Sequence, residues 1–323
     1  MRLGSIALMS ALVAAVLADP ALAQERELRA ISAFAEQTNY TRGFLSFIER
    51  VNEAGKGNLR IRFVGGPKAM PPFEVGTALK NGVVEVAYVT GAYYTNILPE
   101  ADAWKLTERP MAELRKNGAI DYMARLYGQK MNAIYLARHA NDSPFHIYLT
   151  KPIDKPDLTG LKIRVTPVYR DFFSALGATV VQTAPGEVYT ALERGVVDGY
   201  GWPIHGIFDL GWHERTKYRV EPGFYNAEVS VLVNNAAWTK LTEVQRRVIS
   251  EAGQWLETEC TDWAKVNAEE MARQRAAGIQ TITLTRGDAE AFLAKAYEAG
   301  WEGVIRQSPE HGPKLKRFFS KAN

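Results

Sequence analysis

The chain has 323 residues, of which 46% are hydrophobic, and a formal net charge of +3. This length and composition fit a globular protein of two domains of roughly 150 residues each. Lysine and arginine are spread along the chain rather than clustered, which argues against a nucleic-acid or membrane-surface partner.

The N-terminus has the pattern of a secretory signal peptide. Arg2 supplies the positive start, residues 6–17 are almost all apolar, and small residues at 21 and 23 favour cleavage after Ala23. The apolar run is shorter than the ~20 residues that a helix needs to cross a bilayer. We therefore expect residues 24–323 to be exported to the periplasm in soluble form.

Strands and helices alternate in the first part of the chain, which predicts an α/β fold with a largely parallel sheet. The predicted strands are residues 28–34, 58–64 and 86–90, and the first helix is 41–54. In such sheets ligands meet the carboxyl ends of the strands. Phe34, Thr90 and Tyr93 are therefore candidate residues at the edge of a ligand cleft.

Residues 74–85 recur as residues 187–198, with eight of the twelve positions identical. In both copies apolar residues share one face of a short helix, and Gly82 or Gly195 stands where a left-handed residue ends that helix. Chance similarity remains an alternative. The repeat indicates that one α/β unit was built twice, giving two similar lobes with a cleft between them.

The second half begins with a strand at 145–151 that enters the other lobe, followed by strands at 160–165 and 178–181. An apolar pattern without proline runs from 241 to 278, starting in a capping box. As one helix it would be about 55 Å long, so we expect it to bridge both lobes. The predicted lobes are residues 24–146 with about 236–276, and residues 147–235 with about 277–323; the last includes a strand (279–284) and a helix (288–307).

A basic pair lies in the strand Leu-Lys-Ile-Arg-Val at 161–165. Alternation places Lys162 and Arg164 opposite the apolar residues, so one of them can point between the lobes. A guanidinium held there needs an anion, and its fork matches a carboxylate. From the residues alone, Arg164 is either a ligand clamp or a surface or salt-bridged arginine.

This part of the chain resembles the TRAP-transporter solute-binding proteins of the dicarboxylate-binding receptor type. The resemblance rests on the block at 157–165, Leu-Gly-Ala at 176–178, the repeat copy through Gly199, and Pro203. The start of the long helix, residues 238–248, is also similar to that family. The resemblance extends over essentially the whole of residues 24–323.

The resemblance implies a periplasmic-binding-protein-like receptor, two lobes that close on an organic acid. It also implies delivery of the acid to the small and large membrane subunits of a permease, and it gives Arg164 the role of holding the ligand carboxylate. We expect a monomer without a cofactor.

Two positions depart from the sugar-acid and dicarboxylate members of that family. Phe145 stands where a second arginine is frequent, and Trp202 where an asparagine is frequent. Flat apolar walls favour a monocarboxylate with an apolar or aromatic body, unless both rings pack in the lobe cores. Tyr169 and Tyr225 are weaker candidates for contact with the ligand.

Other classes of protein have less support. The sequence holds no Gly-x-Ser-x-Gly or His-Glu-x-x-His motif, which argues against an exported enzyme. The five histidines lack metal-ligand spacing, so we expect surface or capping histidines and no metal site. Cys260, the single cysteine, is expected to be buried and unreactive. A binding protein of an ABC importer or of a sensor remains an alternative.

Overall fold

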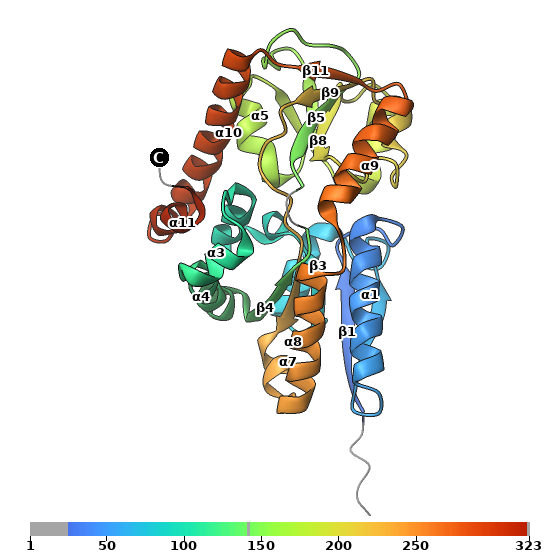
Figure 1. Cartoon of the computed structure of the whole chain (residues 1–323), viewed down its shortest axis with the longest axis vertical. Coiled ribbons are helices and arrows are strands. Elements are labelled where there is room, and N and C mark those ends of the chain that lie inside the picture. The colour runs from blue at the N-terminus through green and yellow to red at the C-terminus, as the bar shows by residue number, and fades with distance from the viewer. Residues whose placement is uncertain (1–24, 141–142, 322–323) are drawn as a thin grey trace, which may run out of the picture.

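The computed structural model describes residues 25–140 and 143–321, and the predicted signal peptide lies outside these ranges. Within them the strands form two sheets, with strand orders β2-β1-β3-β10-β4 and β11-β9-β5-β8-β6-β7. Each sheet with its helices forms one lobe, and Figure 1 shows the two lobes one above the other. No helix in the described ranges is both long and apolar enough to span a bilayer.

The first sheet contains β1 (Arg26–Ser32), β2 (Leu59–Gly65), β3 (Val86–Val89), β4 (Ala133–Arg138) and β10 (Ser230–Asn234). The second contains β5 (Phe145–Leu149), β6 (Lys162–Val165), β7 (Thr179–Gln182), β8 (Gly199–Pro203), β9 (Tyr218–Glu221) and β11 (Gln280–Thr283).

Both sheets are mixed, so the prediction of a largely parallel sheet holds for part of each. β1, β2 and β3 are parallel, whereas β10 is antiparallel to β3 and β4. In the second sheet β6, β7 and β8 are parallel, and β5 is antiparallel to β8 and β9. β5 and β10 are the strands with which the chain enters the opposite lobe. They start at the junction of the lobes and therefore run against their neighbours.

The helices between these strands are mostly short. They are α1 (Asn39–Ala54), α2 (Val75–Lys80), α3 (Met111–Lys116), α4 (Ala119–Leu126), α5 (Arg170–Ala175), α6 (Val188–Glu193) and α7 (Asn235–Thr239). Thr38 caps α1 by accepting a hydrogen bond from the main-chain N of Thr41. The buried face of α1, which includes Phe44 and Phe47, covers the first sheet.

The two repeat copies have the same local structure. α2 and α6 end before Gly82 and Gly195, whose φ angles are 71° and 65°. These are left-handed conformations that glycine adopts without a Cβ penalty. β3 and β8 then begin, at Val86 and Gly199, and β3 starts where the strand at 86–90 was predicted.

The prediction of one continuous helix over residues 241–278 is wrong. Two helices, α8 (Glu243–Thr258) and α9 (Trp263–Ala276), occupy this region. The side chain of Asp262 accepts a hydrogen bond from the main-chain N of Lys265 and starts α9 anew, because a short polar side chain competes for the backbone. α8 lies in the first lobe and α9 in the second (Figure 1), so the bridge has a joint. The predicted capping box of α8 is present.

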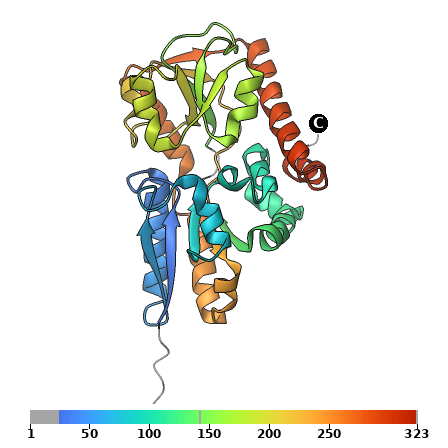
Figure 2. The ribbon, with the colours of Figure 1, turned by 180° about the vertical axis from the view of Figure 1, so that it is seen from behind.

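The chain ends with α10 (Arg286–Gln307) and α11 (Gly312–Phe319). α10 packs on α5, and α11 packs on α4 of the first lobe. Figure 2 shows both helices along one side of the molecule. The main-chain carbonyl of Phe318 accepts a hydrogen bond from Asn117 Nδ2 at 2.8 Å. The sequence did not predict α11, and the predicted lobe boundaries stay a prediction.

Candidate ligand-binding site

A small cavity lies where the two lobes meet. Its walls come from the ends of β1 and β3, the segment before β10, the start of β5, the end of β8 and the turn η5 (Pro167–Tyr169) after β6. Six of the eight residues predicted for the site line it: Phe34, Thr90, Tyr93, Phe145, Tyr169 and Trp202. The cavity measures about 30 Å³, room for roughly two water molecules.

Its walls are largely aromatic and come from both lobes. In the first lobe the ring of Phe34 lies 5.9 Å from that of Tyr93. In the second, the ring of Phe145 lies 5.5 Å from that of Tyr169. Phe145 and Trp202 are 7% and 3% exposed and belong to the hydrophobic core. The alternatives posed for these two residues are therefore compatible, since each ring packs in the core and also borders the cavity.

Arg164 lies on β6 behind this wall and is fully buried. Its Nη1 donates to Tyr169 Oη at 3.1 Å, and its Nη2 donates to the carbonyl of Thr183 at 2.7 Å. Its Nε has no hydrogen-bond partner, and no ion pair among residues 25–140 and 143–321 includes this arginine. Arg164 is thus neither a surface nor a salt-bridged residue. Arg164 does not line the cavity itself, but it is hydrogen-bonded to Tyr169, which does.

Sequence reasoning missed a carboxyl group in the cavity wall. Glu228, just before β10, lines the cavity and is 4% exposed. Its Oε2 accepts hydrogen bonds from the main-chain N of Gly91 at 2.8 Å and from Thr90 Oγ1 at 3.4 Å. Its Oε1 accepts from the hydroxyl of Ser230. Burial raises the pKa of Glu228, although these hydrogen bonds and the charge of Arg138 oppose the rise.

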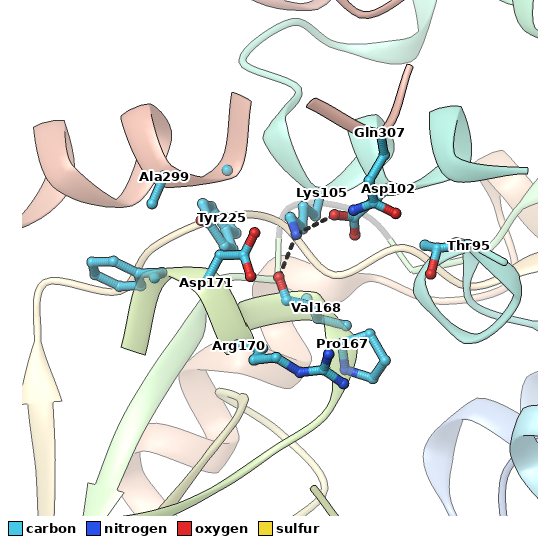
Figure 3. A pocket seen from close by; sticks show the side chains of 12 residues that line it. Thr95, Asp102, Lys105, Pro167, Val168, Arg170, Asp171, Tyr225, Ala299 and Gln307 are labelled. Carbon is cyan, nitrogen blue, oxygen red and sulfur yellow. Dashed lines mark hydrogen bonds and ion pairs between the residues drawn. The ribbon is translucent and has the colours of Figure 1, made fainter. Parts of the chain in front are cut away.

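Tyr225 lies elsewhere. It lines a second cavity, of about 130 Å³, between α5, α10 and the 3₁₀ segment η3 (Pro99–Leu106). Its hydroxyl donates to the carbonyl of Ala296 on α10 at 2.6 Å. Charged side chains surround this second cavity, including Asp102, Lys105 and Asp171 (Figure 3).

Hydrogen bonds join the lobes on both sides of the small cavity. On one side, the buried ammonium of Lys105 donates to the carbonyl of Val168 and to Asp102 Oδ2, the latter at 2.6 Å; Figure 3 shows both contacts as dashed lines. On the other side, the main-chain N of Asn39 at the start of α1 donates to Asp209 Oδ2 at 2.9 Å. The described conformation is therefore a closed one.

Buried histidines lie near the segments that cross between the lobes, so the expectation of surface or capping histidines is wrong for them. His205 stacks on Trp263 at 4.6 Å, and His139 lies 5.0 Å from the same ring. His205 also lies 5.0 Å from Tyr40, which lines the cavity. Burial lowers the pKa of both histidines to about 3, so both are neutral. Cys260 is half-buried, and burial raises the pKa of its thiol.

Over residues 25–140 and 143–321, no group of three or more histidine, cysteine or acidic side chains is arranged to hold a metal ion. The cavity has aromatic walls and a buried carboxyl group from the first lobe, and the buried guanidinium of Arg164 lies behind its wall in the second lobe. Concave sites lined by apolar and aromatic side chains with a few polar groups are typical of small-molecule binding.

Two α/β lobes that are crossed by the chain and close on such a cavity define a bilobal solute-binding receptor. The chain belongs to the family described as bacterial extracellular solute-binding protein, family 7, whose sequence profile matches residues 31–304. The resemblance noted in the sequence is thereby confirmed. The family is one of receptors rather than enzymes.

Similar proteins cover between 72% and 96% of the chain. A solute-binding protein of Roseobacter denitrificans is 26% identical over 319 residues, which are 96% of this chain and 95% of the relative. A monocarboxylate 2-oxoacid-binding periplasmic protein of Nostoc sp. is 26% identical over 249 residues, 72% of this chain and 67% of the relative. The crystal structure of a TRAP periplasmic solute-binding protein of Desulfovibrio salexigens with bound orotic acid matches with a TM-score of 0.81 at 19% identity, covering 91% of this chain and 97% of that one. The predicted bilobal fold is confirmed.

Proposed function

We propose that this protein is the extracytoplasmic receptor of a TRAP transporter and that it binds a monocarboxylate with an apolar or aromatic body. Arg164 holds the carboxylate, and the aromatic rings of the two lobes enclose the body. The names of two relatives support an organic acid, since one binds 2-oxoacids and the other was solved with orotic acid.

The observation that carries this proposal is the environment of Arg164. Its guanidinium is fully buried, its Nε lacks an acceptor, and no ion pair within the described ranges neutralises it. An unpaired charge in a protein interior is costly. The indole Nε1 of Trp202 is also buried without a partner among the described residues. Buried donors are normally paired, so these two groups favour an anionic ligand that supplies acceptors.

The walls support a single carboxylate. Phe145, Trp202 and Tyr93 present rings to the cavity, and a second charge against them costs several kcal/mol when it is desolvated. The cavity of about 30 Å³ is smaller than an organic acid. The acid therefore enters an open form, in which the contacts of Lys105 and Asp209 across the lobes are broken, and its contacts with both lobes favour closure.

The family and the N-terminal sequence support the following setting for this proposal. After cleavage behind Ala23, the monomeric receptor works in the periplasm and passes its ligand to the small and large membrane subunits of the transporter. We propose lobes close to the expected residues 24–146 with about 236–276, and 147–235 with about 277–323. In this division β10 belongs to the first lobe and α9 to the second, and α11 packs on the first lobe.

A thermal-shift screen of organic acids tests the proposal. An acid at 100 times its Kd stabilises the native state by about 2.7 kcal/mol. We expect this response from monocarboxylates with aromatic or branched bodies. Stabilisation by succinate or malate alone, without any response to these monocarboxylates, contradicts the proposed ligand class. Turnover of a bound acid contradicts the assignment as a receptor.

A further inference from the structure

Resting on the proposed function, we infer that Glu228 is a specificity-determining residue that accepts a hydrogen bond from the ligand. The solute is then a monocarboxylate that also carries a hydrogen-bond donor, a hydroxyl or N–H group, on the part of the molecule that faces the first lobe.

The two polar ends of the site have opposite chemistry and lie on different lobes. Arg164 belongs to β6 of the second lobe and bonds Tyr169, which lines the cavity. Glu228 precedes β10 of the first lobe and lines the same cavity. A ligand with a carboxylate for one end and a donor for the other contacts both lobes at once. Such a ligand favours the closed form more than either group does alone.

Glu228 retains room for one more donor. A carboxylate offers about four lone-pair sites, and three are occupied, by the main-chain N of Gly91, Thr90 Oγ1 and the hydroxyl of Ser230. The contact from Thr90 is long, at 3.4 Å. The carbonyl oxygen of a protonated carboxyl group still accepts hydrogen bonds. Glu228 therefore presents an acceptor to the cavity in either protonation state.

No cation is paired with Glu228 within the described ranges. None of the ion pairs there includes it, and the nearby Arg138 donates instead to the carbonyls of Ala140 and Ala227. A second carboxylate on the ligand would meet both this carboxyl group and the aromatic walls. Repulsion by Glu228 therefore contributes to the rejection of dicarboxylates, and replacing Glu228 by a neutral residue weakens that rejection.

Calorimetry with matched pairs of acids tests this inference on the mature receptor in the presence of a chelator. The pairs are lactate with propionate, mandelate with phenylacetate, and phenylalanine with 3-phenylpropionate. We expect the member with a donor to bind about 10- to 100-fold more tightly, as a hydrogen bond to a carboxylate implies. In E228A this preference falls toward unity, while succinate binds better than it does to the native protein. E228Q, which keeps one oxygen acceptor, retains part of the preference.

The outcomes separate this inference from the proposed function. Equal affinity for both members of each pair, with both lost in R164A, overturns the role of Glu228 and leaves the receptor for monocarboxylates intact. If E228A keeps the native preference for the acid with a donor, the role of Glu228 is also overturned and the receptor for monocarboxylates stays intact. The role of Glu228 is also overturned if the chelator abolishes binding of the acids and Ca²⁺ restores it, because a cation then occupies the place proposed for the donor of the ligand. No binding of any acid overturns both proposals.

Discussion

Lys105 of the first lobe donates a hydrogen bond to the main-chain carbonyl of Val168 in the second, one residue before the tyrosine that bonds Arg164. The same ammonium pairs with Asp102 at 2.6 Å, and both side chains of this pair are buried (Figure 3). A lobe-to-lobe contact thus joins the backbone that positions the proposed carboxylate clamp. We therefore expect closure and ligand binding to be linked at this turn.

Replacement of Lys105 by Met should therefore favour the open form. It removes the interlobe hydrogen bond and leaves Asp102 buried without its cation, which costs about 3 kcal/mol of stability. We expect a larger radius of gyration for the ligand-free variant in small-angle X-ray scattering, together with weaker ligand binding. The double variant K105M/D102N is the control, since it removes the unpaired charge. The double variant should regain most of the stability but should remain in the open form. A double variant as compact as the native protein would contradict the role of the Lys105 hydrogen bond in closure.

Arg164→Ala should weaken binding of the acid found in the screen by about 2–5 kcal/mol, because a carboxylate enclosed without its guanidinium stays unpaired. Arg164→Lys keeps the charge but loses the two-pronged geometry, so its affinity should be intermediate. Arg170→Ala changes an exposed arginine at the start of α5 and serves as the matched control. Calorimetry gives the affinities, and circular dichroism shows whether each variant folds. Near-native affinity of a folded R164A would refute the clamp.

Local signals in the sequence were sufficient for much of this picture. The alternation of apolar residues around Arg164 indicated that one of the two basic side chains can point between the lobes, and the structure buries Arg164 completely. The rule that ligands meet the carboxyl ends of strands selected Phe34, Thr90 and Tyr93, which line the cavity. These inferences depend on strand geometry within a few residues, which the sequence determines directly.

The features that the sequence did not predict depend largely on contacts between distant segments. Glu228 reaches the cavity because β10 returns from the second lobe and pairs antiparallel with β3, where Ser230 lies opposite Val89. No local pattern at residue 228 indicates that pairing. The sequence did not predict the break between α8 and α9, because the apolar residues of 241–278 keep helical spacing across it. The break is marked by Asp262, whose side chain caps α9.

The glycines that end the helices of the two repeat copies provide a test of their left-handed conformation. Gly82→Ala and Gly195→Ala should each lower the free energy of unfolding by about 1–2 kcal/mol, because both glycines are left-handed. A Cβ at Gly195 would meet no atom within 4 Å, and one at Gly82 would have Asn234 Nδ2 at 3.9 Å, so backbone strain alone gives the cost. Gly186→Ala is the control, with an open environment and no positive φ. Urea denaturation measures all three, and equal stability of the three variants would contradict the explanation.

The buried histidines should make the receptor less stable in acid. Burial lowers the pKa of His139 and of His205 to about 3, whereas in the unfolded chain each imidazole takes up a proton near pH 6.5. The unfolded state therefore binds more protons as the pH falls from 6.5 toward 3, and the free energy of unfolding declines over that window. Above pH 7 these groups have no effect. At pH 5 the loss is about 2 kcal/mol for each histidine.

His205→Gln isolates one of these contributions. Glutamine takes up no proton in this pH range. Between pH 7 and pH 5 the H205Q variant should therefore lose about 2 kcal/mol less of its free energy of unfolding than the native protein does, whatever the substitution costs at pH 7. Urea denaturation at the two pH values gives the comparison. An H205Q variant that loses as much stability as the native protein on acidification would show that His205 takes up its proton in the folded state as well, and that the aromatic stack with Trp263 does not keep it neutral.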